Sequence, residues 1–231
     1  MLSTTKLIAQ AVGSFLHYEY ALGRGGMFSE RYLTTPVSQA LQYKYKCGVT
    51  AEHKHPSLKG AGGSYPRVDF AAVTGFPKAL AVVETKWTNH ANISRQAILW
   101  DLLRLELVAR ADNAEAFFVL AGERSMITKI STYKWSDGQR AASFLPFGKA
   151  GKIQVKGAVH VLGESLQRRF DEYPEVEFPC SLHLKSPYAY PQQVNEDQKS
   201  SSAKYQVFVW QLNMDLSSRE RFVPSAKASV P

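Results

Sequence analysis

The sequence is poor in cysteine and has no long apolar run. Only Cys47 and Cys180 occur among its 231 residues, too few for a disulfide scaffold. No apolar stretch approaches the roughly 20 residues that a helix needs to cross a bilayer, so we expect no membrane span and no membrane partner. The N-terminal MLSTTKLIAQ lacks the separate apolar region and the cleavage site of a signal peptide. We therefore expect a reduced, cytoplasmic protein.

Acidic residues are fewer than basic ones. The 28 Lys and Arg against 20 Asp and Glu give a formal charge of +8. A basic balance fits a polyanion such as nucleic acid, because Lys and Arg that bind phosphates release counterions. It equally fits a merely soluble basic protein. The 12% of aromatic residues can bury enough apolar surface to exclude disorder, and the length suits a single domain over residues 1–231.

The first half of the chain reads as an α/β (α+β) fold. Capping residues, apolar spacing and Gly-containing turns predict its elements: a helix from Ser3 or Thr4 to Leu22, a turn and second helix over 29–46, strands over 49–55, 65–74 and 79–87, a helix over 92–110, and a strand over 115–121 that is buried on both faces. The signal weakens beyond 122. There we expect short strands at 152–156, 158–162 and 205–212, a mobile loop over 192–204, and a loose tail from about 217.

Two acidic residues are predicted to meet in the middle strands. A hairpin centred between Phe76 and Pro77 places Asp69 opposite Glu84, and period-two alternation puts Lys86 on the same face as Glu84. The surrounding residues are apolar on both faces, so two facing carboxylates there are costly unless a cation neutralises them. Mg²⁺ prefers such oxygen ligands. A one-residue bulge would instead turn Asp69 to the other face.

A third acid lies on the first helix. Its apolar stripe passes through Ile8, Val12, Phe15 and Leu22, and Glu19 occupies the matching position between the last two. One reading is a salt bridge at the edge of the stripe, with Lys86 or an arginine. Given the other two carboxylates, we favour a place for Glu19 at the same metal site.

These positions resemble the PD-(D/E)xK nuclease superfamily. The pattern consists of a helical Glu19, then P-x-x-D at Pro66 and Asp69, then E-x-K at Glu84 and Lys86, followed by an amphipathic helix. The resemblance implies an αβββαβ restriction-endonuclease-like core over residues 1–121, with a mixed sheet flanked by helices and a β-rich extension over 122–231. Gln96 to Trp100 also looks like the Q-x-x-x-Y element of some members, with Trp in place of Tyr.

The resemblance also implies a chemistry. Asp69, Glu84, the backbone carbonyl of Thr85 and, with them, Glu19 would hold one or two Mg²⁺ ions, for which Mn²⁺ can substitute. Lys86 would orient or deprotonate the attacking water, or neutralise developing charge. The implied activity is DNA hydrolysis by an endonuclease of a restriction or anti-phage system, with RNA left open as a substrate and a homodimer or larger complex as its assembly.

Three other functions stay open at this point. They are a repair or resolvase-type nuclease, a non-catalytic nucleic-acid-binding subunit with a nuclease-like fold, and an unrelated α/β enzyme whose Glu84 and Lys86 pair at the surface.

Further candidate substrate contacts are His53, His55, Arg67 and Gln96. His53 and His55 share a strand face, but two ligands without a third do not make a zinc site, so we expect a partly exposed pair near phosphate. The glycine-rich connector over 57–64 lacks the pattern of a P-loop, which argues against nucleotide binding there.

Overall fold

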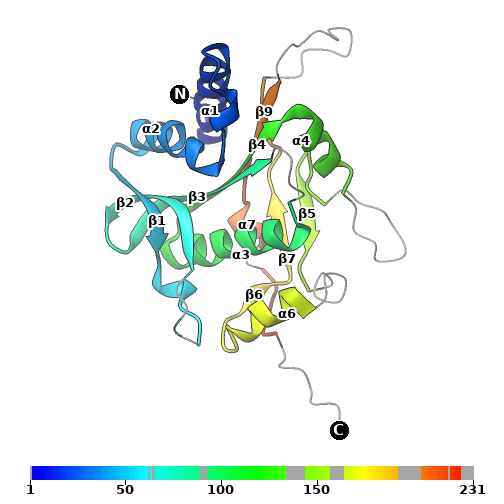
Figure 1. Ribbon diagram of the computed structural model, residues 1–231. Coiled ribbons are helices and arrows are strands. Elements are labelled where there is room, and N and C mark those ends of the chain that lie inside the picture. The colour runs from blue at the N-terminus through cyan, green and yellow to red at the C-terminus, as the bar shows by residue number, and fades with distance from the viewer. Residues whose placement is uncertain are drawn as a thin grey trace.

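The centre of the fold is a six-stranded mixed sheet in the order β1-β2-β3-β4-β9-β8 (Figure 1). This computed structural model describes residues 2–61, 63, 66–88, 93–133, 144–156, 164–191, 204–217 and 219–224. The strands of the sheet are β1 (Gly48–Lys54), β2 (Arg67–Gly75), β3 (Lys78–Thr88), β4 (Glu115–Glu123), β9 (Tyr205–Gln211) and β8 (Tyr188–Tyr190). The β3–β4 pair is parallel and the other neighbours are antiparallel.

Helices cover both faces of this sheet. On one face lie α1 (Thr4–Ala21) and α2 (Thr34–Tyr45), joined through the short helices η1 (Gly25–Met27) and η2 (Glu30–Leu33). On the other face lies α3 (Arg95–Asp112). Adjacent strand residues such as Val82 and Val83 are both fully buried but belong to different hydrophobic clusters, because strand side chains alternate between the two faces.

The C-terminal half adds a layer outside α3. This layer and its connections comprise α4 (Arg124–Ser131), β5 (Gly151–Gln154), α6 (Glu164–Asp171), β6 (Phe178–Pro179), β7 (Ser181–Leu184), α7 (Met214–Ser217) and β10 (Arg221–Phe222), and η3 (Pro56–Leu58) precedes β2. Phe170, Phe178 and Leu182 of this layer share the hydrophobic cluster of α3. Helix α3 is therefore enclosed between the sheet and the C-terminal layer, and its Asp101 and Glu106 are buried with its leucines.

The coarse fold agrees with the sequence prediction, with two differences. The mixed α/β sheet flanked by helices is present, and the turn and second helix expected over 29–46 are the 3₁₀ helix η2 and α2. Residues 1–121 do not complete the sheet, because β9 and β8 come from the second half. Where we expected a loose tail, β10 pairs with β6.

Some predictions concern segments that the structure does not describe. The strand expected at 158–162 and most of the loop expected over 192–204 lie outside the described residues, as do residues 225–231. No helix in the described part of the chain is both long and apolar enough to span a membrane.

Candidate functional site

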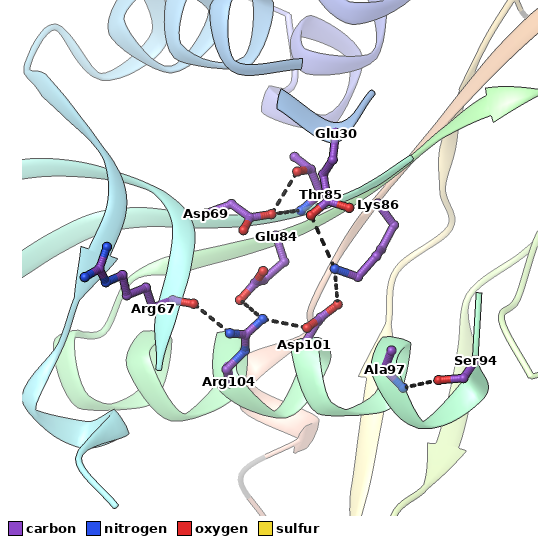
Figure 2. A network of polar contacts seen from close by, with 10 residues as sticks. All are labelled: Glu30, Arg67, Asp69, Glu84, Thr85, Lys86, Ser94, Ala97, Asp101 and Arg104. Carbon is purple, nitrogen blue, oxygen red and sulfur yellow. Dashed lines mark hydrogen bonds and ion pairs between the residues drawn. The ribbon is translucent and has the colours of Figure 1, made fainter. Parts of the chain in front are cut away.

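The strands β2 and β3 part at Asp69. Their register matches the prediction at Phe70, which lies opposite Val83, and two irregularities in the ladder fall nearer the turn, between Ala72 and Val73 and between Val73 and Gly75. At Asp69, which precedes Phe70, the carboxylate takes the place of the strand backbone as the partner of Thr85. Its Oδ2 accepts hydrogen bonds from the Thr85 backbone N–H at 2.7 Å and from the Thr85 hydroxyl at 2.8 Å. An acidic side chain therefore occupies the gap where the two strands separate (Figure 2).

Glu84 points from β3 toward α3 and is fully buried. Its Oε1 lies 3.0 Å from the Arg104 guanidinium, yet neither carboxylate oxygen has a partner with hydrogen-bond geometry among the described residues. Burial raises the pKa of Glu84 well above its usual range, and the charges of Asp101 and Asp69 raise it further, against the opposing effect of Arg104. Glu84 is thus a buried acid whose charge is incompletely compensated.

Lys86 lies two residues further along β3, on the same face. Its Nζ is 2.9 Å from Asp101 Oδ2 and 3.5 Å from Glu30 Oε1. Burial opposes the charge of Lys86, but the carboxylates of Asp101, Glu30 and Glu84 outweigh it and raise the pKa of the lysine. Lys86 is therefore a protonated cation in this arrangement, suited to neutralising charge rather than to removing a proton.

Three members of this cluster were not found from the sequence: Glu30, Asp101 and Arg104. Arg104 bridges Glu84 and Asp101 and also donates a hydrogen bond to the backbone carbonyl of Arg67 at 2.7 Å (Figure 2). Asp101 and Arg104 stand three residues apart in the α3 run WDLLRLELV, where leucines fill nearly every other position. A helix so apolar is covered on several sides, which was a signal that its charges must pair with each other or with the sheet.

The acidic cluster comprises Glu30, Asp69, Glu84 and Asp101 with Lys86 and Arg104. When every group is ionised, four carboxylates against two cations leave a net charge of −2. This surplus is what a divalent cation would neutralise. Burial raises the pKa of Glu30, and the charges of Asp69 and Asp101 add to this effect against the opposing charge of Lys86.

Glu19 does not join the acidic cluster, contrary to the role that we favoured for it. It is buried on α1 as predicted, but its carboxylate accepts hydrogen bonds from the Arg24 guanidinium and from the Tyr32 hydroxyl. These hydrogen bonds lower the pKa of Glu19. The chain turns back after α1 and brings Arg24 onto the helix, so the ion-pair alternative describes Glu19. Glu30, beyond that turn, is the N-terminal acid that reaches the cluster.

The ring of His53 contacts the turn between β2 and β3, and the ring of His55 contacts the C-terminal end of α3. His53 is 1% exposed, its ring nitrogen lies 3.1 Å from the Pro77 carbonyl, and burial lowers its pKa. His55, 4% exposed, contacts Ser57 at 2.7 Å and Asp112 at 3.2 Å. Their expected partial exposure is therefore wrong, because hydrogen-bond partners within the fold bury both rings.

Two further candidate contacts, Arg67 and Gln96, lie on β2 and α3, the elements that also carry Asp69 and Asp101. The side chain of Arg67 points away from the cluster, and only its backbone carbonyl takes part, through Arg104 (Figure 2). Gln96 lies in the first turn of α3, after the N-cap Ser94. Trp100, one turn further on, packs in the C-terminal layer against Phe170, Tyr173 and Phe178 rather than toward the acidic cluster.

The donor set fits a hard divalent cation in part. No group of three or more His, Cys, Asp and Glu side chains within the described ranges is arranged to hold a metal. Mg²⁺, however, usually keeps several waters and takes only one or two carboxylates. Asp69 and Glu84 supply two carboxylates, and the oxygens of Glu84 have no hydrogen-bond partner in the described ranges. The net negative charge of the cluster favours binding of a cation. Arg104 supplies one positive charge to Glu84 in this arrangement.

Comparisons of the chain with protein-family models, with curated proteins and with solved structures gave no significant match. The chemistry of the acidic cluster is therefore the basis for assigning a function.

Proposed function

We propose that the chain is a divalent-cation-dependent nuclease that hydrolyses phosphodiester bonds in DNA. The observation that carries the proposal is Glu84. It is a fully buried acid beside Asp69, its oxygens have no hydrogen-bond partner within the described part of the chain, and the cationic Lys86 lies two residues further on. A stable core would replace such an acid by an apolar residue unless its charge had a use. The overall charge of +8 favours a polyanionic substrate.

In this mechanism Asp69, Glu84 and the Thr85 backbone carbonyl would hold Mg²⁺ or Mn²⁺. When bound, the ion polarises the scissile phosphate and lowers the pKa of a water molecule. The residues of the chain orient the acidic ligands and supply positive charge. Thr85 fixes one oxygen of Asp69 through its N–H and hydroxyl. Asp101 and Glu30 hold Lys86 in its charged form, so that its ammonium can stabilise the negative charge that develops on the phosphate.

The biological setting of this activity is proposed from the resemblance alone. An endonuclease of a restriction or anti-phage system is the first choice, and a repair or resolvase-type nuclease is the second. Cutting both strands of a duplex would favour a homodimer, because each active site then faces one strand.

A second candidate is a non-catalytic nucleic-acid-binding subunit with the same fold. The position of Arg104 favours it: the guanidinium lies on Glu84 at 3.0 Å and already supplies part of the charge that a metal would bring. The two candidates differ in whether the acidic cluster takes up a divalent cation and turns over substrate.

The test is cleavage of plasmid and single-stranded DNA in Mg²⁺ or Mn²⁺ by the wild type, Asp69→Asn and Lys86→Met. We expect each variant to lose about 100- to 1,000-fold in rate, as removal of one group that stabilises a transition state does. The matched control is Lys78→Met, which removes an exposed lysine at the start of the same strand and should leave the rate unchanged. A wild type inert on DNA and RNA with both metals would refute the nuclease proposal.

A further inference from the structure

A cavity of about 310 Å³, which we call the aromatic pocket, lies at the end of β3, where the chain also carries Lys86 of the acidic cluster. Its lining consists of Tyr20, Gly23, Gly25, Gly26, Phe28, Trp87, Glu123, Lys204 and Tyr205. Trp87 and Glu123 come from the carboxyl ends of the parallel strands β3 and β4. Open α/β sheets bind ligands at that edge.

The pocket and the acidic cluster are connected through one strand end. Trp87 follows Lys86 directly and points to the opposite face, where it packs in the hydrophobic cluster of α1. The backbone of Trp87 hydrogen bonds to the Glu30 carboxylate, which in turn lies 3.5 Å from Lys86. The pocket and the acidic cluster therefore share the carboxyl end of β3, where Lys86 and Trp87 point to opposite faces of the sheet.

Aromatic rings form the body of the pocket. Phe28 and Tyr205 are buried with ring centroids 4.9 Å apart, and Trp87 lies 5.7 Å from each of them. Tyr20 is 44% exposed and meets Tyr205 edge to face at 5.4 Å, so it forms an accessible rim of the pocket. Such rings offer stacking surfaces to a flat ligand.

Polar groups in the pocket can form hydrogen bonds with the edge of such a ligand. The indole N–H of Trp87 is buried and has no hydrogen-bond partner among the described residues. The Glu123 carboxylate is an acceptor, and the ammonium of Lys204 lies 3.6 Å from it and over the rings of Tyr20 and Tyr205. At Gly25 a Cβ would come within 2.8 Å of the Tyr20 ring, so the chain can follow the rings closely only without a side chain there.

We propose that the aromatic pocket takes an unpaired nucleobase of the substrate strand. A donor N–H, a carboxylate acceptor, stacking faces and a nearby ammonium are the groups that bind a base next to its backbone phosphate. A base reaches such a pocket only outside a duplex, so the substrate class is single-stranded or locally unpaired nucleic acid. This inference rests on the proposed function for the choice of nucleic acid over other flat ligands.

The test measures binding of the full chain to labelled 12-nucleotide strands by fluorescence anisotropy in Ca²⁺ at fixed ionic strength. One strand is oligothymidylate and the other is an abasic strand of the same length. We expect the wild type to bind the base-bearing strand about fivefold to 140-fold more tightly, which is the range for stacking one base. Tyr20→Ala should remove most of this preference. Tyr18→Ala removes a tyrosine that is 62% exposed on the same helix and should leave the preference unchanged.

Trp87→Phe keeps a ring but removes the indole N–H, which has no partner among the described residues. We expect it to weaken binding of the base-bearing strand about twofold to twelvefold, with no change for the abasic strand. Equal affinity of the wild type for both strands, no binding of either, or a Tyr20→Ala variant that behaves like the wild type would each overturn the pocket inference.

Failure of this inference and failure of the proposed function give different results. A Tyr20-dependent preference for bases in a chain that cleaves nothing would leave the pocket and refute the nuclease. Cleavage without any preference for bases would leave the nuclease and refute the pocket.

Discussion

Two buried glutamates of this molecule, Glu106 and Glu84, face arginines in different ways. Both are fully buried. Glu106 on α3 accepts from both arms of the Arg221 guanidinium, at 2.6 Å and 3.2 Å, so each of its oxygens is satisfied. Glu84 lies 3.0 Å from Arg104, and neither of its oxygens has a partner with hydrogen-bond geometry in the part of the chain that the structure describes. The same pair of residue types thus builds a completed structural link in one place and an incomplete, charged cluster in the other.

This difference indicates which of the two glutamates belongs to a functional site. The Glu106–Arg221 link ties the C-terminal β10 to α3, and a bidentate pair of this kind needs no further ligand. Glu84 carries a desolvation cost that its arginine does not offset, and it lies among three more carboxylates. Incomplete compensation beside like charges is typical of sites that bind or catalyse.

The largest expected effect on stability comes from breaking the Glu106–Arg221 ion pair. Arg221→Ala leaves the charge of Glu106 buried without its main partner, so we expect the free energy of unfolding to fall by about 3–5 kcal/mol. Urea unfolding followed by circular dichroism measures it. A loss below about 1 kcal/mol would show that the link between β10 and α3 is not structural.

A matched pair of substitutions sharpens the comparison. Glu106→Gln weakens two charge-assisted hydrogen bonds from Arg221, and we expect it to cost about 1–3 kcal/mol of stability. Glu84→Gln replaces an acid whose oxygens lack hydrogen-bond partners among the residues that the structure describes, so at pH 8 without metal it should cost nothing or stabilise the chain. Urea unfolding of both variants provides the comparison. Equal losses would contradict the distinction between the two glutamates.

A smaller effect is the dependence of the metal-free folding stability on pH. The raised pKa of Glu84 means that the folded chain keeps a proton that the unfolded chain releases near pH 4.5. Metal-free stability should therefore fall as the pH rises from about 4.5 through the folded-state pKa, and Glu84→Gln should lack this fall. The lowered pKa of His53 acts in the opposite direction below about pH 6.5, so the difference between wild type and variant isolates Glu84. Parallel stability curves would contradict the assignment.

Local signals in the sequence predicted the elements that surround the acidic cluster. The N-cap Ser3, the turn at Phe76 and Pro77, and the alternation of the two hairpin strands gave α1 and the β2–β3 pairing correctly. They did so because each depends on residues that are close in the chain. The pairing brought Asp69, Glu84 and Lys86 to one end of the hairpin, where the structure has them.

The remaining members of the cluster depend on contacts between distant segments. Glu30 reaches Lys86 only because the turn after α1 folds over the end of β3. Asp101 and Arg104 face the sheet because the C-terminal layer covers the other side of α3, and the weak strand signals beyond residue 122 did not reveal that layer. Glu19 was misplaced for the same reason, since Arg24 returns to it across a turn.

The most direct test of the central claim is calorimetric titration of Mn²⁺ into the wild type, Glu84→Gln and Glu106→Gln. If the incompletely paired acid is a metal ligand, the wild type and Glu106→Gln bind the ion with similar affinity, and Glu84→Gln weakens binding at least tenfold. Absence of a heat of binding in the folded wild type, or equal affinity in Glu84→Gln, would contradict the account.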